Sequence, residues 1–403
     1  MNTARIALDD TAIVNESIHL KSNRKTSRNI SGIKMRFRQI RLLTHIMFLI
    51  IERTKSLPKF LTTFKQIRAI RKVNMGDVRL RKFVKAGSQL SWSMYAPPYP
   101  SNEFDNLINL ELDYLMQQNG VNSPLHFIFL SITKTCPLQC EHCFEWDIMH
   151  QKEKLSLIDL KSIVRKFQDR NISSIFLTGG EPLSRYDDLI ELIKYSSKKS
   201  KIWVFTSGYS LTLKKAHELK NAGLQGVLIS IDHYKAEEHN AFRGNPHSFQ
   251  KAIQAVQHAN EAGLITAISI CVTRSFISEE NLKNYMEFAK NLNVAFVQFF
   301  EPKKEGNYKD KDVLLSLEQL NLLENFFRKF NDSAANNAYP LIIYHGYHQR
   351  KNGCHGAGKR YLYVDSNGDI QACPFCPTKM GSALDKNLSF TQGVCKPYVI
   401  SKN

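Results

Sequence analysis

The strongest constraint on the fold is a regular alternation of strand-like and helix-like stretches between residues 125 and 301. Short apolar, β-rich runs recur there, and an amphipathic stretch follows each of the first five. The apolar runs end near Thr133, Thr178, Thr206, Asp232, Thr273 and Glu301, and the helical stretches include Ile158–Asp169, Asp187–Ser197, Leu213–Ala222, Phe249–Ala262 and Leu282–Leu292. Because strand–helix–strand units place consecutive strands parallel, the pattern predicts an α/β fold around a six-stranded parallel sheet.

Three cysteines follow the first of these runs. Cys136, Cys140 and Cys143 are spaced C-x₃-C-x₂-C, directly after the apolar run 125–133. The carboxyl ends of parallel strands are where α/β sheets bind their ligands. Three thiolates suit a [4Fe–4S] cluster, because each binds one iron and the fourth iron stays open to another ligand.

Two other interpretations of the triplet exist. The thiols could be core residues, or they could bind zinc with His142 or His150 as the fourth ligand. The close spacing beside Pro137 argues against the first interpretation, and the motifs further along the chain argue against both.

The triplet resembles the signature of the radical S-adenosylmethionine (SAM) enzymes. The resemblance extends over roughly residues 125 to 395 and implies a partial (β/α)6 version of the TIM barrel, open on one side for the substrate. One position departs from the family pattern. The residue before the last cysteine is usually aromatic, and here it is His142, whose planar ring can still stack.

Further motifs at the strand ends strengthen this resemblance. The second strand ends in Gly179-Gly180-Glu181-Pro182, where two glycines allow close approach of a ligand to the backbone. In the family this motif aligns the amino group of SAM. By the same resemblance Ser207 is a candidate for the ribose, Ser230 and Arg243 for SAM, with Arg243 suited to its carboxylate, and Asp232 for SAM or the substrate.

The last segment of the chain has a different character. Cys354 precedes a hairpin signal at Asp365-Ser-Asn-Gly, and Cys373, Cys376 and Cys395 follow it. This order resembles a SPASM or twitch domain, and four thiolates would complete one auxiliary [4Fe–4S] cluster. A zinc site with four cysteines is the alternative. Cys271 lies within an apolar run and is expected in the core.

The basic charge is concentrated at the N-terminus. The net charge is +18, and residues 1–90 hold 20 Lys and Arg against 5 Asp and Glu. We expect a disordered tail over 1–34 and two basic amphipathic helices plus a hairpin over 35–122, ahead of a core barrel at 123–335 and an auxiliary-cluster domain at 336–403. The apolar helix faces are expected to dock on the barrel. A surface for an acidic membrane, or for an anionic substrate or partner, is the alternative, and no nucleic-acid motif accompanies the charge.

The eight cysteines are clustered, and no secretory leader is recognised. These two features favour metal binding and a cytoplasmic location. Peripheral contact with the inner face of the membrane extends the membrane alternative given above. The longest apolar run, Leu42 to Ile51, is too short to span a bilayer.

The resemblance implies that reductive cleavage of SAM gives a 5′-deoxyadenosyl radical, which abstracts hydrogen from a substrate. A ribosomally made peptide is the first expectation for that substrate, with a small metabolite, a lipid, or a non-catalytic iron–sulfur or zinc scaffold as alternatives. A flavodoxin or ferredoxin would donate the electron. No catalytic residue is assigned, although Glu301 ends the sixth strand at the correct mouth of the barrel.

Overall fold

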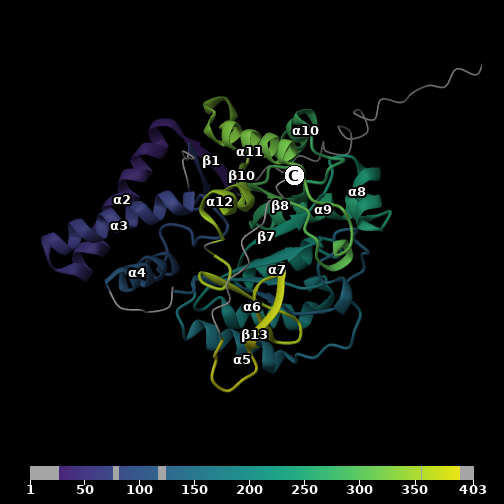
Figure 1. The fold of residues 1–403 in the computed structure, drawn as a ribbon, viewed down its shortest axis with the longest axis horizontal. Helices are drawn as coiled ribbons and strands as arrows, with labels where there is room; N and C mark the ends of the chain where they lie inside the picture. Colours follow the sequence, from purple (N-terminus) through teal and green to yellow (C-terminus); the bar gives the residue numbers. More distant parts are fainter. Residues whose placement is uncertain (1–26, 76–80, 117–123, 355, 391–403) are drawn as a thin grey trace, which may run out of the picture.

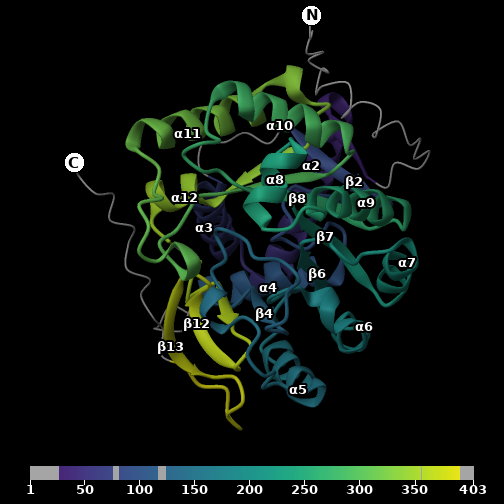
Figure 2. The same ribbon diagram turned by 90° about the vertical axis from the view of Figure 1, so that its right-hand side faces the viewer.

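A large, mostly parallel sheet forms the centre of the structure, a computed structural model that describes residues 27–75, 81–116, 124–354 and 356–390. Figures 1 and 2 show helices along the outer side of the sheet, and the last strands of the chain lie beside β4. The six predicted parallel strands are β4 (Phe127–Ser131), β5 (Ser174–Thr178), β6 (Lys201–Thr206), β7 (Leu224–Ser230), β8 (Ile265–Cys271) and β9 (Phe296–Phe300). Each ends within three residues of the predicted position, so the six-stranded core is confirmed.

The sheet continues beyond these six strands at both edges. Strand β10 (Leu341–Tyr344) pairs parallel with β9, and β11 (Tyr361–Val364) pairs parallel with β4. Strands β12 (Asp369–Cys373) and β13 (Cys376–Ser382) follow β11 as antiparallel neighbours. The order β10-β9-β8-β7-β6-β5-β4-β11-β12-β13 is therefore an open sheet of ten strands in the described residues. The segment predicted as a separate cysteine-rich domain thus contributes strands to both edges of the barrel sheet.

Helices cover the outer face of the sheet. The five predicted barrel helices are α5 (Leu157–Gln168), α6 (Tyr186–Ser196), α7 (Leu213–Asn221), α9 (Ser248–Glu261) and α10 (Glu279–Asn291), and a further helix, α11 (Leu317–Asp332), follows β9. Local signals set their ends. Ser156 caps α5 in a reciprocal pair with Asp159, and Gly223 and Gly263 take positive φ angles directly after α7 and α9. Helix α8 (Ala236–Arg243) is short and polar, and no sequence pattern predicted it.

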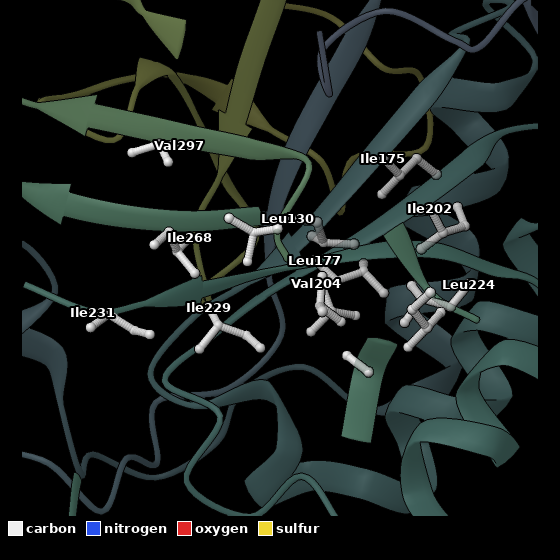
Figure 3. Packing of buried hydrophobic residues seen from close by; sticks show 14 of the residues in the cluster. Leu130, Ile175, Leu177, Ile202, Val204, Leu224, Ile229, Ile231, Ile268 and Val297 are labelled. Carbon is white, nitrogen blue, oxygen red and sulfur yellow. The ribbon is translucent and has the colours of Figure 1, made fainter. Parts of the chain in front are cut away.

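Side-chain alternation along the strands divides the core into two layers. Residues such as Leu130, Leu177, Val204 and Ile229 point towards the helices and form the outer layer (Figure 3). Their neighbours in sequence form an inner layer that is aromatic near the amino ends of the strands, including Phe127, Phe176, Trp203 and Phe296. Towards the carboxyl ends the inner positions become polar, with Ser131, Ser230, Ser269 and Gln298.

The N-terminal extension closes the amino end of the barrel. Strands β2 (Lys82–Ala86) and β3 (Gln89–Ser91) form the predicted hairpin, and α4 (Asn102–Met116) follows it. Between these elements the Tyr95 ring packs 5.1 Å from Phe176 and 4.6 Å from His345, which begins α12 (His345–Asn352). The aromatic inner layer is therefore covered at this end, and a ligand must approach from the carboxyl ends of the strands.

Two long helices precede the hairpin, α2 (Gly32–Thr54) and α3 (Leu57–Met75). They project from the side of the barrel next to α4 (Figure 1). Part of the tail predicted over 1–34 is ordered, because residues 27–31 form β1 (Ser27–Ser31), which pairs antiparallel with β2, and α2 starts at Gly32. The rest of the predicted tail, 1–26, lies outside the described residues. No helix in the described ranges is long and apolar enough to cross a membrane.

Candidate functional site

The cysteine triplet lies on the loop between β4 and η1 (Trp146–Ile148), at the carboxyl end of the sheet. Cys140 is buried, and Cys136 and Cys143 are partly exposed. Burial raises the pKa of the Cys136 and Cys143 thiols to about 12, and that of Cys140 as well. Three separate segments of the chain hold this cysteine loop in place through backbone contacts.

The first of these contacts comes from the Gly-Gly-Glu segment after β5. The Gly180 amide donates to the Thr133 carbonyl (2.8 Å), and the Glu181 amide donates to the Thr135 carbonyl (2.8 Å). A Cβ at Gly180 would lie 2.5 Å from the Thr135 oxygen, and one at Gly179 would lie 2.6 Å from the Thr133 oxygen. The sequence predicts that the two glycines allow a ligand to approach the backbone closely. In this structure they make room for the backbone of the cysteine loop itself.

The second contact comes from the end of α8. The Gln139 amide donates to the Arg243 carbonyl (3.1 Å), and the Glu141 amide donates to the Phe242 carbonyl (2.9 Å). The His142 ring stacks on Phe242, with centroids 4.8 Å apart and planes inclined by 21°. This confirms that His142 can stack in place of an aromatic residue, and burial lowers its pKa to about 4, so the ring is neutral.

The third contact comes from η3 (Gly306–Tyr308), after β9. The Asn307 amide donates to the Cys143 carbonyl (2.9 Å), and the Tyr308 hydroxyl donates to Glu141 Oε1 (3.1 Å). Gly306 has a φ of 55°, and a Cβ there would lie 2.2 Å from the Cys143 oxygen. This contact could not be predicted from the sequence, because only a glycine in a polar loop marks the segment.

Arg243 links the fourth strand end to the cysteines. Its Nε donates to Asp232 Oδ2 (2.6 Å), its Nη2 lies 2.5 Å from the same oxygen, and its Nη1 donates to Cys140 Sγ (3.4 Å). Burial alone would lower the pKa of Arg243, but the Asp232 charge outweighs it and raises that pKa. The structure thus brings together three residues that sequence motifs had singled out separately.

Glu181 and Ser207 also meet. Glu181 is fully buried, and its carboxylate accepts hydrogen bonds from the Thr206 hydroxyl (2.5 Å), the Leu183 amide (3.0 Å), the Ser207 amide (2.7 Å) and the Ser207 hydroxyl. This carboxylate therefore ties the ends of β5 and β6 together. The hydroxyl of Ser230 lies 3.4 Å from that of Ser269 on the inner face.

Two buried polar atoms at the inner side of the barrel have no hydrogen-bond partner among the described residues. They are His142 Nδ1, in the cysteine loop, and Gln298 Oε1, in β9, whereas the buried Ser131 hydroxyl and Glu145 carboxylate hydrogen-bond each other. Buried polar groups are normally paired, because an unmet group loses the hydrogen bonds that water would give it. The carboxyl end of the barrel therefore has unmet polar atoms that a polar ligand such as SAM would satisfy, and three thiols beside them that fit an iron–sulfur cluster.

A single-ion site is not formed. No three His, Cys, Asp or Glu side chains in the described ranges lie close enough together to share one metal ion. A [4Fe–4S] cube makes a different demand, because each thiolate binds a different iron.

The turn that carries Cys373 and Cys376 lies near the triplet. Cys373 and Cys376 face each other at the turn between β12 and β13. Phe375, inside this turn, packs 5.7 Å from Phe144, which directly follows Cys143. Cys354 accepts a hydrogen bond from Gln349 (3.8 Å), and Cys395 lies outside the described residues. The predicted core position of Cys271 is confirmed, since it is 5% exposed in β8.

Glu301 is part of an ion network. Its carboxylate accepts from the Tyr344 hydroxyl (2.5 Å) and pairs with Arg350 (2.5 Å) and Lys303 (3.2 Å). Burial would raise its pKa, but the two cations outweigh burial and lower it. Neighbours from β10 and α12 thus stabilise the charged carboxylate and lower its affinity for a proton. Because a base must take up a proton, Glu301 is a poor general base.

Comparison with known proteins agrees with this geometry. Residues 130–291 match the Radical SAM superfamily. An AdoMet-dependent heme synthase of Oleidesulfovibrio alaskensis is 26% identical over 278 residues, which is 63% of this chain and 71% of that protein. A GTP 3′,8-cyclase of Aliarcobacter butzleri is 29% identical over 192 residues, 45% of this chain and 58% of the cyclase. In fold, the chain resembles Streptococcus suis SuiB bound to the precursor peptide SuiA, with a TM-score of 0.57, 17% identity, and coverage of 85% of this chain and 79% of SuiB.

An open β/α barrel with a cysteine loop clamped at its carboxyl end is the architecture of an enzyme that works with a metal cluster at the barrel mouth. Residues 130–291 thus form a radical SAM domain by similarity, and the enzymes of that superfamily use a [4Fe–4S] cluster and SAM. The comparisons leave the specific reaction of this chain open.

Proposed function

We propose that this chain is a radical SAM enzyme that modifies a ribosomally made peptide. Cys136, Cys140 and Cys143 would hold the SAM-binding [4Fe–4S] cluster, and the C-terminal cysteines one auxiliary [4Fe–4S] cluster: Cys354, Cys373, Cys376 and Cys395. The observation that carries the proposal is the cysteine loop itself, which three backbone contacts fix at the open end of the barrel beside unmet polar groups.

The chain's own residues would bind and orient the cofactor. SAM would lie beside the Gly179–Glu181 segment and the side chains of Ser207 and Ser230, with Glu181 as an acceptor for its amino group and Arg243, held by Asp232, as the cation for its carboxylate. When bound and reduced, the cluster with SAM supplies a radical that abstracts a hydrogen atom. The electron would come from a flavodoxin or ferredoxin.

Two observations support a peptide substrate. The fold is similar to that of SuiB, which was solved with its precursor peptide. In addition, Phe144 and Phe375 bring the turn of Cys373 and Cys376 beside the triplet, so a second cluster would lie next to the first. An auxiliary cluster there can accept the electron that a closed-shell product must lose after hydrogen abstraction.

A small metabolite is the second candidate substrate. The heme synthase and the GTP 3′,8-cyclase match 63% and 45% of this chain, and both names denote reactions on small molecules. Transfer of deuterium into 5′-deoxyadenosine separates the two classes. Label from a deuterated peptide digest, and none from a deuterated small-molecule extract, supports the peptide; the reverse result rejects it.

Iron and sulfide counts after anaerobic reconstitution test the cluster assignment. We expect about eight irons in the wild type and about four in either Cys136→Ala/Cys140→Ala/Cys143→Ala or Cys354→Ala/Cys373→Ala/Cys376→Ala. Four irons in the wild type and none in the first variant would remove the auxiliary cluster from the proposal.

A further inference from the structure

Exposed apolar side chains are concentrated on α2 and the start of α3. Of the thirteen large hydrophobic residues that the described part of the chain exposes, eight lie there, each 50% to 72% exposed: Ile33, Phe37, Ile40, Leu43, Phe48, Ile51, Leu57 and Leu61. The other five are scattered singly over the molecule: Met116, Trp146, Ile158, Leu317 and Leu384. Single exposed hydrophobic residues are ordinary, whereas a cluster of eight marks an interaction surface.

The spacing shows that α2 has two apolar faces. Ile33, Phe37, Ile40, Phe48 and Ile51 recur at steps of three, four and eight residues, which places them on one side of the helix. A separate set faces the protein, including Met35, Leu49 and Ile50, which pack against the hairpin and α4. Docking on the body of the protein, expected from the sequence, therefore accounts for one apolar face and leaves the other exposed.

The charge around the exposed face is almost entirely positive. Residues 32–71 contain ten Lys and Arg and one acidic residue, Glu52. Lys34, Arg36 and Arg41 are exposed on α2, and Lys55 and Lys59 are exposed at the junction with α3. In the described structure only Arg53 of these ten cations forms an ion pair, with Asp113. An apolar row bordered by cations fits a surface that is apolar below and anionic at its rim.

We propose that the exposed face of α2 and the start of α3 docks on an anionic lipid bilayer, with both helices lying in the plane of the headgroups. This surface, the eight residues named above with their bordering cations, is called the lipid face below. The inference is independent of the substrate and would hold for any reaction at the barrel.

The chemistry of the lipid face favours a bilayer over a protein partner. The face is a projecting helix pair (Figure 1), which can enter a headgroup layer from the side. Its long cations can reach phosphates while their neighbours insert Phe, Ile and Leu side chains. A second copy of the chain would bring like charges together, because the same face on both copies carries the same cations.

The test is co-sedimentation of the full chain with extruded vesicles, either pure phosphatidylcholine or with 30% phosphatidylserine as a nominal composition of about one anionic lipid in three. Phe37→Ser/Phe48→Ser removes two exposed rings, and Lys34→Gln/Arg36→Gln/Arg41→Gln removes three cations. The matched control is Ile158→Ser/Leu317→Ser, which removes two exposed apolar side chains on α5 and α11. The residues replaced in the double Phe variant and in the matched control are all exposed, so the thermal midpoint of these two variants should stay unchanged.

We expect the wild type and the matched control to bind anionic vesicles equally. The double Phe variant should lose binding by at least about a hundredfold, since each ring accounts for about a tenfold effect or more. The cation variant should lose about fivefold per charge and only on anionic vesicles.

Three outcomes would overturn the proposal. The full-length wild type could stay in the supernatant with anionic vesicles. The double Phe variant could sediment as well as the matched control. In lipid-free sedimentation velocity, a wild-type dimer that the double Phe variant abolishes would assign the face to a second copy of the chain.

Discussion

Replacing Gly306 by alanine tests how far the cysteine loop depends on its third backbone contact. Gly306 combines a φ of 55° with a Cβ position only 2.2 Å from the Cys143 carbonyl oxygen and 2.6 Å from Phe144 Cα. An alanine therefore meets two separate problems, a left-handed backbone and a collision with the loop that carries the triplet.

Gly87 is a matched control that isolates the collision. Its φ is 58°, and nothing lies within 4 Å of the Cβ position. The left-handed conformation should cost either alanine about 1–2 kcal/mol. In Gly306→Ala the loop must also shift, which breaks the hydrogen bond from the Asn307 amide to the Cys143 carbonyl (2.9 Å). An unmet backbone pair adds about 1–3 kcal/mol, so we expect a total of about 2–5 kcal/mol.

Urea unfolding and iron content after reconstitution are the two measurements. Gly87→Ala should lose about 1–2 kcal/mol and bind iron like the wild type. Gly306→Ala should lose more stability and a large part of the triplet's iron. Equal destabilisation of the two variants with full iron in both would refute the view that η3 holds the cysteine loop in place.

Three further predictions concern stability. Burial lowers the pKa of His345 to about 4, below about 6.5 for an unfolded chain, so the unfolded state takes up the proton first as the pH falls. His345 alone should lower the free energy of unfolding by up to about 3 kcal/mol from pH 6.5 to 4, and His345→Phe should remove that part of the decline in urea titrations. Asp232→Ala leaves Arg243 buried without its counter-charge and should cost about 3–5 kcal/mol by urea unfolding; a loss below 1 kcal/mol would contradict a tight pair. Lys82→Met leaves the carbonyls of 336–340 without their buried ammonium donor and should cost about 2 kcal/mol, and an unchanged midpoint would rule out this anchor.

The alternating core could be predicted from the sequence because its signals are local. Each strand from β4 to β9 is an apolar run, and each helix after the first five of them has its own apolar face. The pairings of β10 with β9 and of β11 with β4 could not be predicted, because strands of four residues carry no information about a distant neighbour. Helix α8 was missed because it is short and has few apolar side chains to reveal its period.

The candidate site shows the same division. The motifs identified Cys136, Gly180 and Arg243, and the structure brings all three to the cysteine loop. Motifs did not show what the glycines make room for, nor that η3 contributes a contact, since both depend on which backbones meet in three dimensions. The sequence shows the apolar residues of α2, but it does not show that they form two faces. One face packs against the body of the protein, and the other is exposed.

The most direct test of the central claim is SAM cleavage by the reconstituted, reduced wild type and the Cys136→Ala/Cys140→Ala/Cys143→Ala variant. The account predicts 5′-deoxyadenosine from the wild type and none from the variant, with both proteins folded by circular dichroism. No 5′-deoxyadenosine from a wild type carrying its full iron, with candidate peptides and metabolites supplied, would contradict the assignment of radical chemistry to this cysteine loop.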